Sequence, residues 1–262
     1  MSSSGFGQEV SHGLPTSIPA PVVRDPAEVA QRCEDDPRLP PGTCERVAGY
    51  GVMGLTFASG DVLGLRRWTA SSVGERFTSI WHRDPNGSWT FYESVRSEIG
   101  CTRYFGADVE RVRIEPIGLE WEGRRRLHIR TGTASVEWTV ELSSTPLTRL
   151  MSLVGPAIPV ALWRRRPVLG AVGRLAGLTL GAGRVQLTGL TSNEQHFDAT
   201  PVRICFVRES RAVIEGRDLG PVGPLPVQAQ IADFCIPQRG LFAMGRVFVT
   251  PIERDRSTPQ PA

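Results

Sequence analysis

Two groups of side chains have the types and the spacing for proton transfer. His82 lies beside a predicted turn, and Glu93 lies on the strand that returns from it. A histidine oriented by a carboxylate is the usual arrangement of a general acid or base. In the second group, His196 stands between Glu194 and Asp198, and alternate residues share one side of an extended chain. We take His82, Glu93 and His196 as candidate catalytic residues; the simpler alternative is that both groups are solvated polar loops.

The sequence holds no motif for metal, nucleotide or Schiff-base chemistry. Its 30 basic residues are all arginine, which removes the lysine amine that a Schiff base requires. Neither a zinc spacing of cysteine and histidine nor GxSxG, HExxH or a P-loop is present. We therefore expect no metal and no cofactor. Since the net charge is only +3 and arginines are interspersed with acidic residues, we also expect no nucleic-acid partner.

Cysteine usage bears on the cellular compartment. Cys33, Cys44, Cys101, Cys205 and Cys235 are widely spaced and odd in number. This is typical of unpaired thiols in a reducing compartment, with a bridge between Cys33 and Cys44 as an open alternative. Residues 1–14 lack the basic and then apolar segments of a secretory signal. We predict a cytoplasmic protein, with peripheral membrane contact as an alternative.

The elements that must position the candidate residues are mainly strands. Alternating β-branched and aromatic residues at Phe77–His82 and Trp89–Ser94 flank an Asp-Pro-Asn-Gly turn. Proline presets one φ angle and Asn-Gly supplies positive φ, which favours an antiparallel hairpin. Further strands are predicted at Val52–Phe57, Val62–Thr69, Val109–Glu115, Ile117–Glu122, Arg126–Thr131, Ser135–Leu142, Arg184–Leu190, Val202–Glu209, Arg211–Glu215, Val227–Phe234 and Gly240–Val249.

The strands from Ile117 to Leu142 predict a meander with one apolar and one charged face. Apolar residues occupy alternate positions on one side, while glutamate, arginine and histidine occupy the other. The charged face is typical of a solvated surface with cross-strand ion pairs, and a polar barrel lumen is the alternative. In the first interpretation His128 pairs with Glu120 or Glu137.

Residues 145–183 interrupt the strand pattern. Apolar residues recur at helical spacing from Leu147 to Val154, and Trp163 is followed by three arginines. The stretch is too short and too often broken by proline to span a bilayer, which takes about 20 residues. An apolar helix face near tryptophan and arginine is typical of an interfacial anchor or of a lid over a pocket. We therefore take Leu147 to Arg166 as a candidate membrane contact, against the simpler alternative of a connection packed on the sheet.

Several short segments resemble a family of uncharacterised bacterial proteins. They are Trp81-His82-Arg83-Asp84-Pro85-Asn86-Gly87 with Trp89 and Tyr92, Arg103-Tyr104-Phe105-Gly106, Glu215-Gly216-Arg217-Asp218-Leu219-Gly220 and Pro237-Gln238-Arg239-Gly240. The resemblance covers about residues 52–249. More distantly, the two-part β layout resembles the lipocalin-like calycin group, which includes carotenoid hydratases and cofactor-free cyclases. That resemblance implies a β-barrel scaffold with an apolar cavity, and no functional residue of that group can be matched to a position here.

The predicted fold is mainly β, with antiparallel meander sheets forming a lipocalin-like barrel or two half-barrels and a helical crossover in the middle. The chain divides into a loose N-terminal arm (1–49), a first β half (50–144), the helical connection or lid (145–183), a second β half (184–252) and a polar tail (253–262). Within the arm, Asp25 is a candidate N-cap and Pro26 the first residue of a short helix.

These expectations lead to a cavity that binds an apolar small molecule such as a lipid, a terpenoid or a polyketide-like compound. One alternative is a cofactor-independent hydratase, isomerase or cyclase that acts on such a molecule, in which His82 or His196 moves a proton. Another is a structural or protein-interaction domain with no cavity. Aromatic residues are the predicted lining: Trp68, Trp81, Trp89, Tyr92, Tyr104, Trp121 and Trp138.

Overall fold

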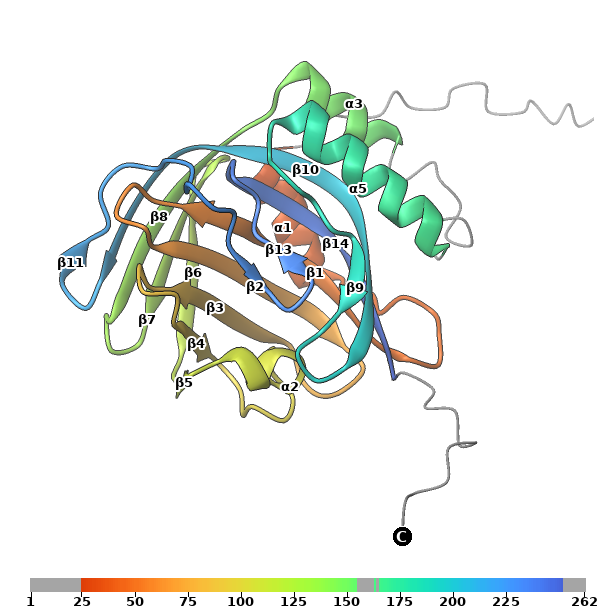
Figure 1. Ribbon diagram of the computed structural model, residues 1–262, viewed down its shortest axis with the longest axis horizontal. Coiled ribbons are helices and arrows are strands. Elements are labelled where there is room, and N and C mark those ends of the chain that lie inside the picture. The colour runs from red at the N-terminus through yellow and green to blue at the C-terminus, as the bar shows by residue number, and fades with distance from the viewer. Residues whose placement is uncertain (1–24, 155–162, 164, 252–262) are drawn as a thin grey trace, which may run out of the picture.

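One large, mostly antiparallel sheet dominates the computed structural model, which describes residues 25–154, 163 and 165–251 (Figure 1). Two short strands, β9 (Thr188–Leu190) and β11 (Arg217–Asp218), pair with β10 at its margin. The main path from edge to edge is β5 (Arg111–Ile114), β4 (Trp89–Glu93), β3 (Phe77–Arg83), β2 (Val62–Ser71), β1 (Glu45–Thr56), β14 (Leu241–Pro251), β10 (Gln195–Ile214), β8 (Val136–Ser143), β7 (Arg126–Thr131) and β6 (Ile117–Glu122).

The sheet is strongly curved, and its two edges approach each other (Figure 1). Only Glu115 and Pro116 separate the edge strands β5 and β6 along the chain, so the sheet has to curl. No ladder between β5 and β6 closes the barrel in the described part of the chain. The prediction of a mainly β, largely antiparallel fold is therefore confirmed. The alternative of two half-barrels is wrong, because β1 pairs with β14 and joins both halves into one sheet.

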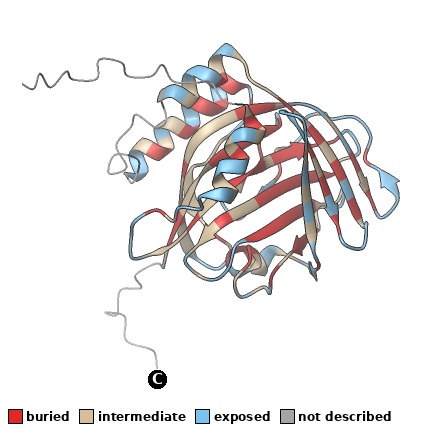
Figure 2. Ribbon diagram, turned by 180° about the vertical axis from the view of Figure 1, so that it is seen from behind, coloured by how far each residue is buried: buried red, intermediate tan, exposed pale blue. Residues whose placement is uncertain are grey.

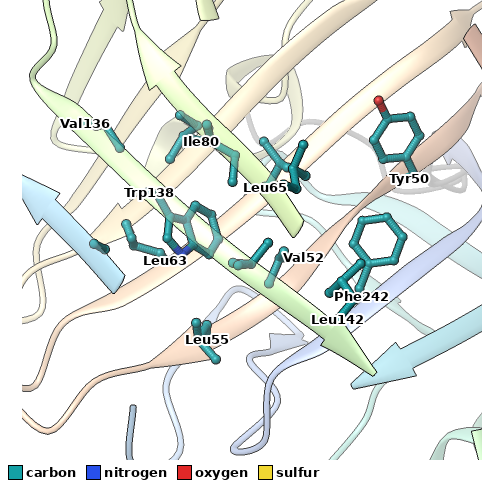
Figure 3. Close-up of a cluster of buried hydrophobic side chains, with 14 of the residues drawn as sticks. Tyr50, Val52, Leu55, Leu63, Leu65, Ile80, Val136, Trp138, Leu142 and Phe242 are labelled. Atoms are coloured by element: carbon teal, nitrogen blue, oxygen red, sulfur yellow. The ribbon is translucent and has the colours of Figure 1, made fainter. Parts of the chain in front are cut away.

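The concave face is packed with apolar side chains from strands that are far apart in the sheet. Leu63 and Leu65 of β2 share one cluster with Trp138 of β8 (Figure 3). Ile129 of β7 belongs to the same cluster. Trp138 is 1% exposed, and its Nε1 donates to Ser210 Oγ at 2.8 Å. The expected hollow interior is therefore wrong over most of the described sheet, because large side chains from facing strands fill it.

The predicted hairpin around the Asp-Pro-Asn-Gly turn forms between β3 and β4. Asp84 Oδ1 accepts a hydrogen bond from the Ser88 backbone at 2.9 Å, and Gly87 has a φ of 103°, which glycine adopts without strain. The predicted boundary between the loose arm (1–49) and the first β half is wrong, because β1 already begins at Glu45. Residues 1–24 of that arm lie outside the described residues.

The prediction of two separate strands at Val202–Glu209 and Arg211–Glu215 is also wrong. Here β10 runs without interruption from Gln195 to Ile214 and pairs with β14 along its first part and with β8 along its second. The register with β8 shifts between Val207 and Glu209. The polar residues that resemble a turn therefore mark an exposed bulge, where the strand leaves one partner for the other.

The helices lie around the sheet. Helix α1 (Pro26–Asp35) begins with Pro26 as predicted, but the Asp25 side chain forms an ion pair with Arg124 at 3.2 Å instead of capping the helix. The remaining elements are the short helices α2 (Thr102–Phe105) and η1 (Gly106–Asp108), the hairpin β12 (Gln230–Ile231) with β13 (Phe234–Cys235), and helices α3 (Pro146–Val154) and α5 (Arg166–Leu180).

Helices α3 and α5 form the predicted helical crossover and cover the outer face near β10 (Figure 1). Helix α5 is followed by Gly181, whose left-handed backbone (φ 61°) closes the last turn. None of the described helices is both long enough and apolar enough to cross a bilayer.

Candidate functional site

An apolar cavity of about 490 Å³ lies between the convex face of the sheet and helices α3 and α5. Its floor comes from β1, β14 and β10, which lie at the middle of the sheet. Helices α3 and α5 form its walls, and part of the β13 region closes one end. The apolar lining includes Met53, Leu147, Met151, Val172, Ala176, Leu180, Ile204, Leu241, Ala243 and Val247.

The helices and strands present apolar side chains to this cavity for local reasons. On α5, Val172, Ala176 and Leu180 are spaced by four residues and therefore share one helix face. On β10, Ile204 points outward, while its neighbour Cys205 belongs to the concave core, as strand alternation requires. Gly49 lies in the floor, and only glycine fits there, because a Cβ atom would lie 1.9 Å from the Arg67 carbonyl oxygen of the neighbouring strand.

Few polar groups border the cavity. Among the described lining residues there is no aspartate, glutamate or histidine. Cys235 lies at the margin, where its Sγ is 2.7 Å from Gln186 Oε1, and Arg246 supplies a cation. The site can therefore remove an apolar molecule from water, but the described lining residues supply neither a carboxylate nor an imidazole to move a proton.

His82 does not border this cavity. It lies on the concave side of β3, and its Nε2 is 2.8 Å from Oδ1 of the fully buried Asp61. Arg217 binds the same carboxylate with two hydrogen bonds of 2.9 and 2.8 Å. Burial by itself raises the pKa of Asp61, but the hydrogen bonds from Arg217, His82 and Ser59 outweigh it and hold the pKa well below its usual range. An ionised carboxylate only accepts hydrogen bonds, so His82 Nε2 donates to it.

Glu93 lies on the opposite face of the sheet from His82, so the two candidates do not share a site. The register pairs Glu93 with Ser79 and His82 with Thr90. Glu93 accepts hydrogen bonds from the Thr102 backbone at 3.1 Å and from Thr102 Oγ1 at 2.9 Å. Burial is the main cause of its raised pKa.

Two further buried groups lie near Glu93. Burial lowers the pKa of Arg66 to about 10, and its guanidinium donates to the carbonyls of Val52, Leu65 and Met53. Burial raises the pKa of the Cys101 thiol to about 12, so this cysteine is protonated at neutral pH. The sequence-based interpretation of Cys101 as a packed thiol agrees with this environment.

His196 lies in β10, and its neighbours do not form a ligand set. Asp198 Oδ1 accepts from Thr188 Oγ1 at 2.6 Å, and Glu194 has a φ of 58° in the turn before the strand. The buried Nδ1 of His196 has no hydrogen-bond partner in the described structure. Across the described residues, no three histidine, cysteine or acidic side chains are grouped to hold a metal ion.

Most of the aromatic side chains that were predicted to line a cavity are packed instead in two hydrophobic clusters, one on each face of the sheet. Only Trp68 borders the apolar cavity. Trp121 borders a second cavity of about 260 Å³ near α1, where Glu34 binds Arg67 at 2.7 Å and accepts from the Tyr50 hydroxyl at 2.9 Å. The other predicted residues pack elsewhere. Tyr92 and Trp138 lie in the concave core, and Trp81 and Trp89 lie in an outer cluster to which α2 contributes Tyr104.

The charged face of the meander is a solvated surface, as the sequence indicates. Arg126 pairs across strands with Glu141 at 3.2 Å, and Arg130 approaches Glu137 at 3.6 Å. The predicted pairing of His128 with Glu120 or Glu137 is wrong, because His128 Nε2 contacts Glu122 at 3.0 Å.

Comparisons with known proteins provide little beyond the fold description. No protein-family model and no curated protein matches the sequence. Among solved structures, the acetoacetate decarboxylase of Legionella pneumophila matches with a TM-score of 0.40 and 11% sequence identity, over 89% of this chain and 96% of that one. A likeness this distant carries no argument about activity.

The residues that sequence reasoning missed are those of α5. Its apolar side chains repeat every three to four residues from Val168 to Leu180, which is the signal of an amphipathic helix. That signal predicts an apolar face, but it does not predict that this face stands away from the sheet and leaves a cavity.

Proposed function

We propose that the protein binds an apolar small molecule in the cavity between the sheet and helices α3 and α5. The observation that carries this proposal is the lining, which is almost entirely apolar over a volume of about 490 Å³. Pockets that hold small molecules are typically of this size and character. A lipid, a terpenoid or a polyketide-like compound has the matching chemistry. We also propose that the protein is distantly related to the lipocalin-like group, whose members bind apolar molecules.

Binding is favoured over catalysis by the position of the ionisable groups. Neither His82 nor His196 borders the cavity, and Glu93 lies under α2, where it is held by Thr102. A hydratase, isomerase or cyclase needs a proton donor or acceptor within hydrogen-bond reach of its substrate. The enzymatic alternative therefore has no observation in its favour at this cavity.

Filling the cavity tests the proposal. Ala176 is 4% exposed and borders the cavity, so Ala176→Trp should occupy the space that the ligand needs. With the fluorescent fatty acid cis-parinaric acid as probe, we expect affinity to fall by about tenfold or more, which corresponds to roughly 1.4 kcal/mol or more of binding free energy. Fluorescence titration measures this change.

Ala171→Trp is the matched control, because Ala171 is exposed on the same helix and does not border the cavity. It should bind the probe as the wild type does, and so should His82→Ala and His196→Ala. Equal affinity of Ala176→Trp and wild type would contradict the proposed site. Independently of these variants, mass spectrometry of apolar molecules that copurify with the native protein would identify the ligand class.

A further inference from the structure

The interspersed pattern of charges ends at Glu141. Between Leu142 and Asn193 the sequence has no aspartate or glutamate, but it has six arginines. The rest of the chain has 24 arginines against 27 acidic residues. Positive charge is therefore concentrated on the segment that includes α3 and α5, while the remainder of the protein has a slight negative excess.

The same two helices expose leucines to solvent. Leu150 and Leu153 of α3 are 57% and 45% exposed, and Leu175 and Leu178 of α5 are 61% and 83% exposed. In each helix an arginine directly precedes the first leucine, and the second leucine follows three residues later. This Arg-Leu-x-x-Leu spacing places both leucines on one side of the helix, next to a cation. Figure 2 shows the exposed stripes on these helices.

The two exposed faces are close together in space. Leu150 and Leu175 both border the apolar cavity, although they lie on different helices and are 25 residues apart in the sequence. Leu150 and Leu175 therefore lie at one cavity margin, and with the exposed Leu153 and Leu178 of the same two helices we call them the apolar patch. Exposed arginines lie on the same two elements: Arg149 and Arg174 directly precede Leu150 and Leu175, and Arg165 and Arg166 stand at the start of α5.

We propose that this patch docks on the surface of an anionic lipid bilayer. Helices that lie in a membrane interface insert leucines to a shallow depth and place arginines among the lipid phosphates. Charge favours this partner over a second copy of the chain, because two such patches would bring arginines against arginines. Among the described residues, Arg166 approaches Asp198 at 3.9 Å, so this carboxylate already has a partner within its own chain. The binding requires no spanning helix.

Docking also gives the cavity a source of ligand. Because Leu150 and Leu175 belong both to the patch and to the cavity lining, a docked protein holds the cavity margin at the bilayer surface. An apolar molecule can then pass between lipid and protein without crossing water. This last step rests on the proposed binding function, whereas the docking itself does not.

Flotation with vesicles tests the docking. The probes are vesicles of phosphatidylcholine alone and vesicles that also contain phosphatidylglycerol, each at low and at high salt. We expect the wild type to float with the anionic vesicles, to float at least tenfold less with the neutral ones, and to be released by salt, since salt screens exposed charges. Absence of the wild type from the anionic vesicles at low salt would overturn the proposal.

Two variants separate the leucines from the arginines. Leu175→Ser with Leu178→Ser, and Arg165→Ser with Arg174→Ser, should each reduce anionic vesicle binding at least tenfold. Ile114→Ser is the matched control, because Ile114 is as exposed as Leu150 but lies on edge strand β5. It should float as the wild type does, and an equal loss in this control would overturn the patch assignment. Circular dichroism confirms that each variant is folded.

Two further measurements distinguish the remaining outcomes. Ala176→Trp should still float, since it fills the cavity and leaves the patch intact; this separates a failure of ligand binding from a failure of docking. Light scattering after gel filtration should find the wild type and the leucine variant in the same oligomeric state. A wild-type dimer that the leucine substitutions dissociate would overturn the proposal and assign the patch to self-association.

Discussion

Replacing Trp138 with alanine is expected to lower the free energy of unfolding by about 3–5 kcal/mol, as is usual for large aromatic residues in packed cores. Trp138 is 1% exposed and lies in a cluster that joins strands from both ends of the sheet. The substitution leaves a void between facing strands and removes the hydrogen bond to Ser210. Chemical denaturation measures the loss.

Trp138→Phe provides the control for this experiment. Phenylalanine retains most of the apolar contact and loses only the hydrogen bond and part of the volume, so it should cost about 1–2 kcal/mol. A loss below about 1 kcal/mol for Trp138→Ala would mean that the concave side is not packed as described. The experiment thus tests the filled interior, which the sequence did not predict.

Removing Arg217 is the second substitution with a large expected effect. Arg217→Met leaves the fully buried carboxylate of Asp61 without its two guanidinium hydrogen bonds. Loss of one partner from a buried ion pair costs about 3–5 kcal/mol, and we expect the lower end because the Arg217 side chain is itself 49% exposed. Urea denaturation at neutral pH measures the effect.

A double variant checks the cause. In Arg217→Met with Asp61→Asn, the unpaired buried charge is absent, so the loss should be smaller than the sum of the two single losses. Strict additivity of the two substitutions would contradict a direct interaction between Arg217 and Asp61.

The same carboxylate predicts how stability depends on pH. The pKa of Asp61 is lowered in the folded protein, so its contribution is fully present above the unfolded pKa of about 3.9 and is lost as the pH falls toward the folded pKa. Wild-type stability should therefore fall below about pH 4. Arg217→Met should lose less stability over the same range, because its Asp61 is no longer held ionised by the guanidinium. Equal acid sensitivity in both proteins would contradict this role.

Local patterns in the sequence were sufficient to predict most strands, but they were not sufficient to predict the candidate site. The hairpin around Asp84 and the strands Ile117–Glu122 and Arg126–Thr131 follow from turn chemistry and alternation, and their bounds agree with the structure. His82 and Glu93 were paired because they flank one turn. In the observed register the residue opposite His82 is Thr90, three positions from Glu93, so strand alternation puts the two side chains on opposite faces.

The position of the cavity depended on long-range packing. Aromatic residues at strand period were expected to line a hollow centre, but facing strands are close enough for Trp138 and its neighbours to fill it. The space lies instead outside the sheet, where α5 and α3 stand over a floor with Gly49 and Ala243. No local pattern states which face of a curved sheet a helix covers, and this limited the site prediction.

The order of strands has a consequence for biosynthesis. The last strand, β14, occupies the middle of the sheet between β1 and β10. Until residues 241–251 have left the ribosome, β1 and β10 each expose an unpaired edge, which is a template for wrong pairing. The sheet is therefore completed only once residues 241–251 have emerged, and a nascent chain that still lacks them should depend on chaperones.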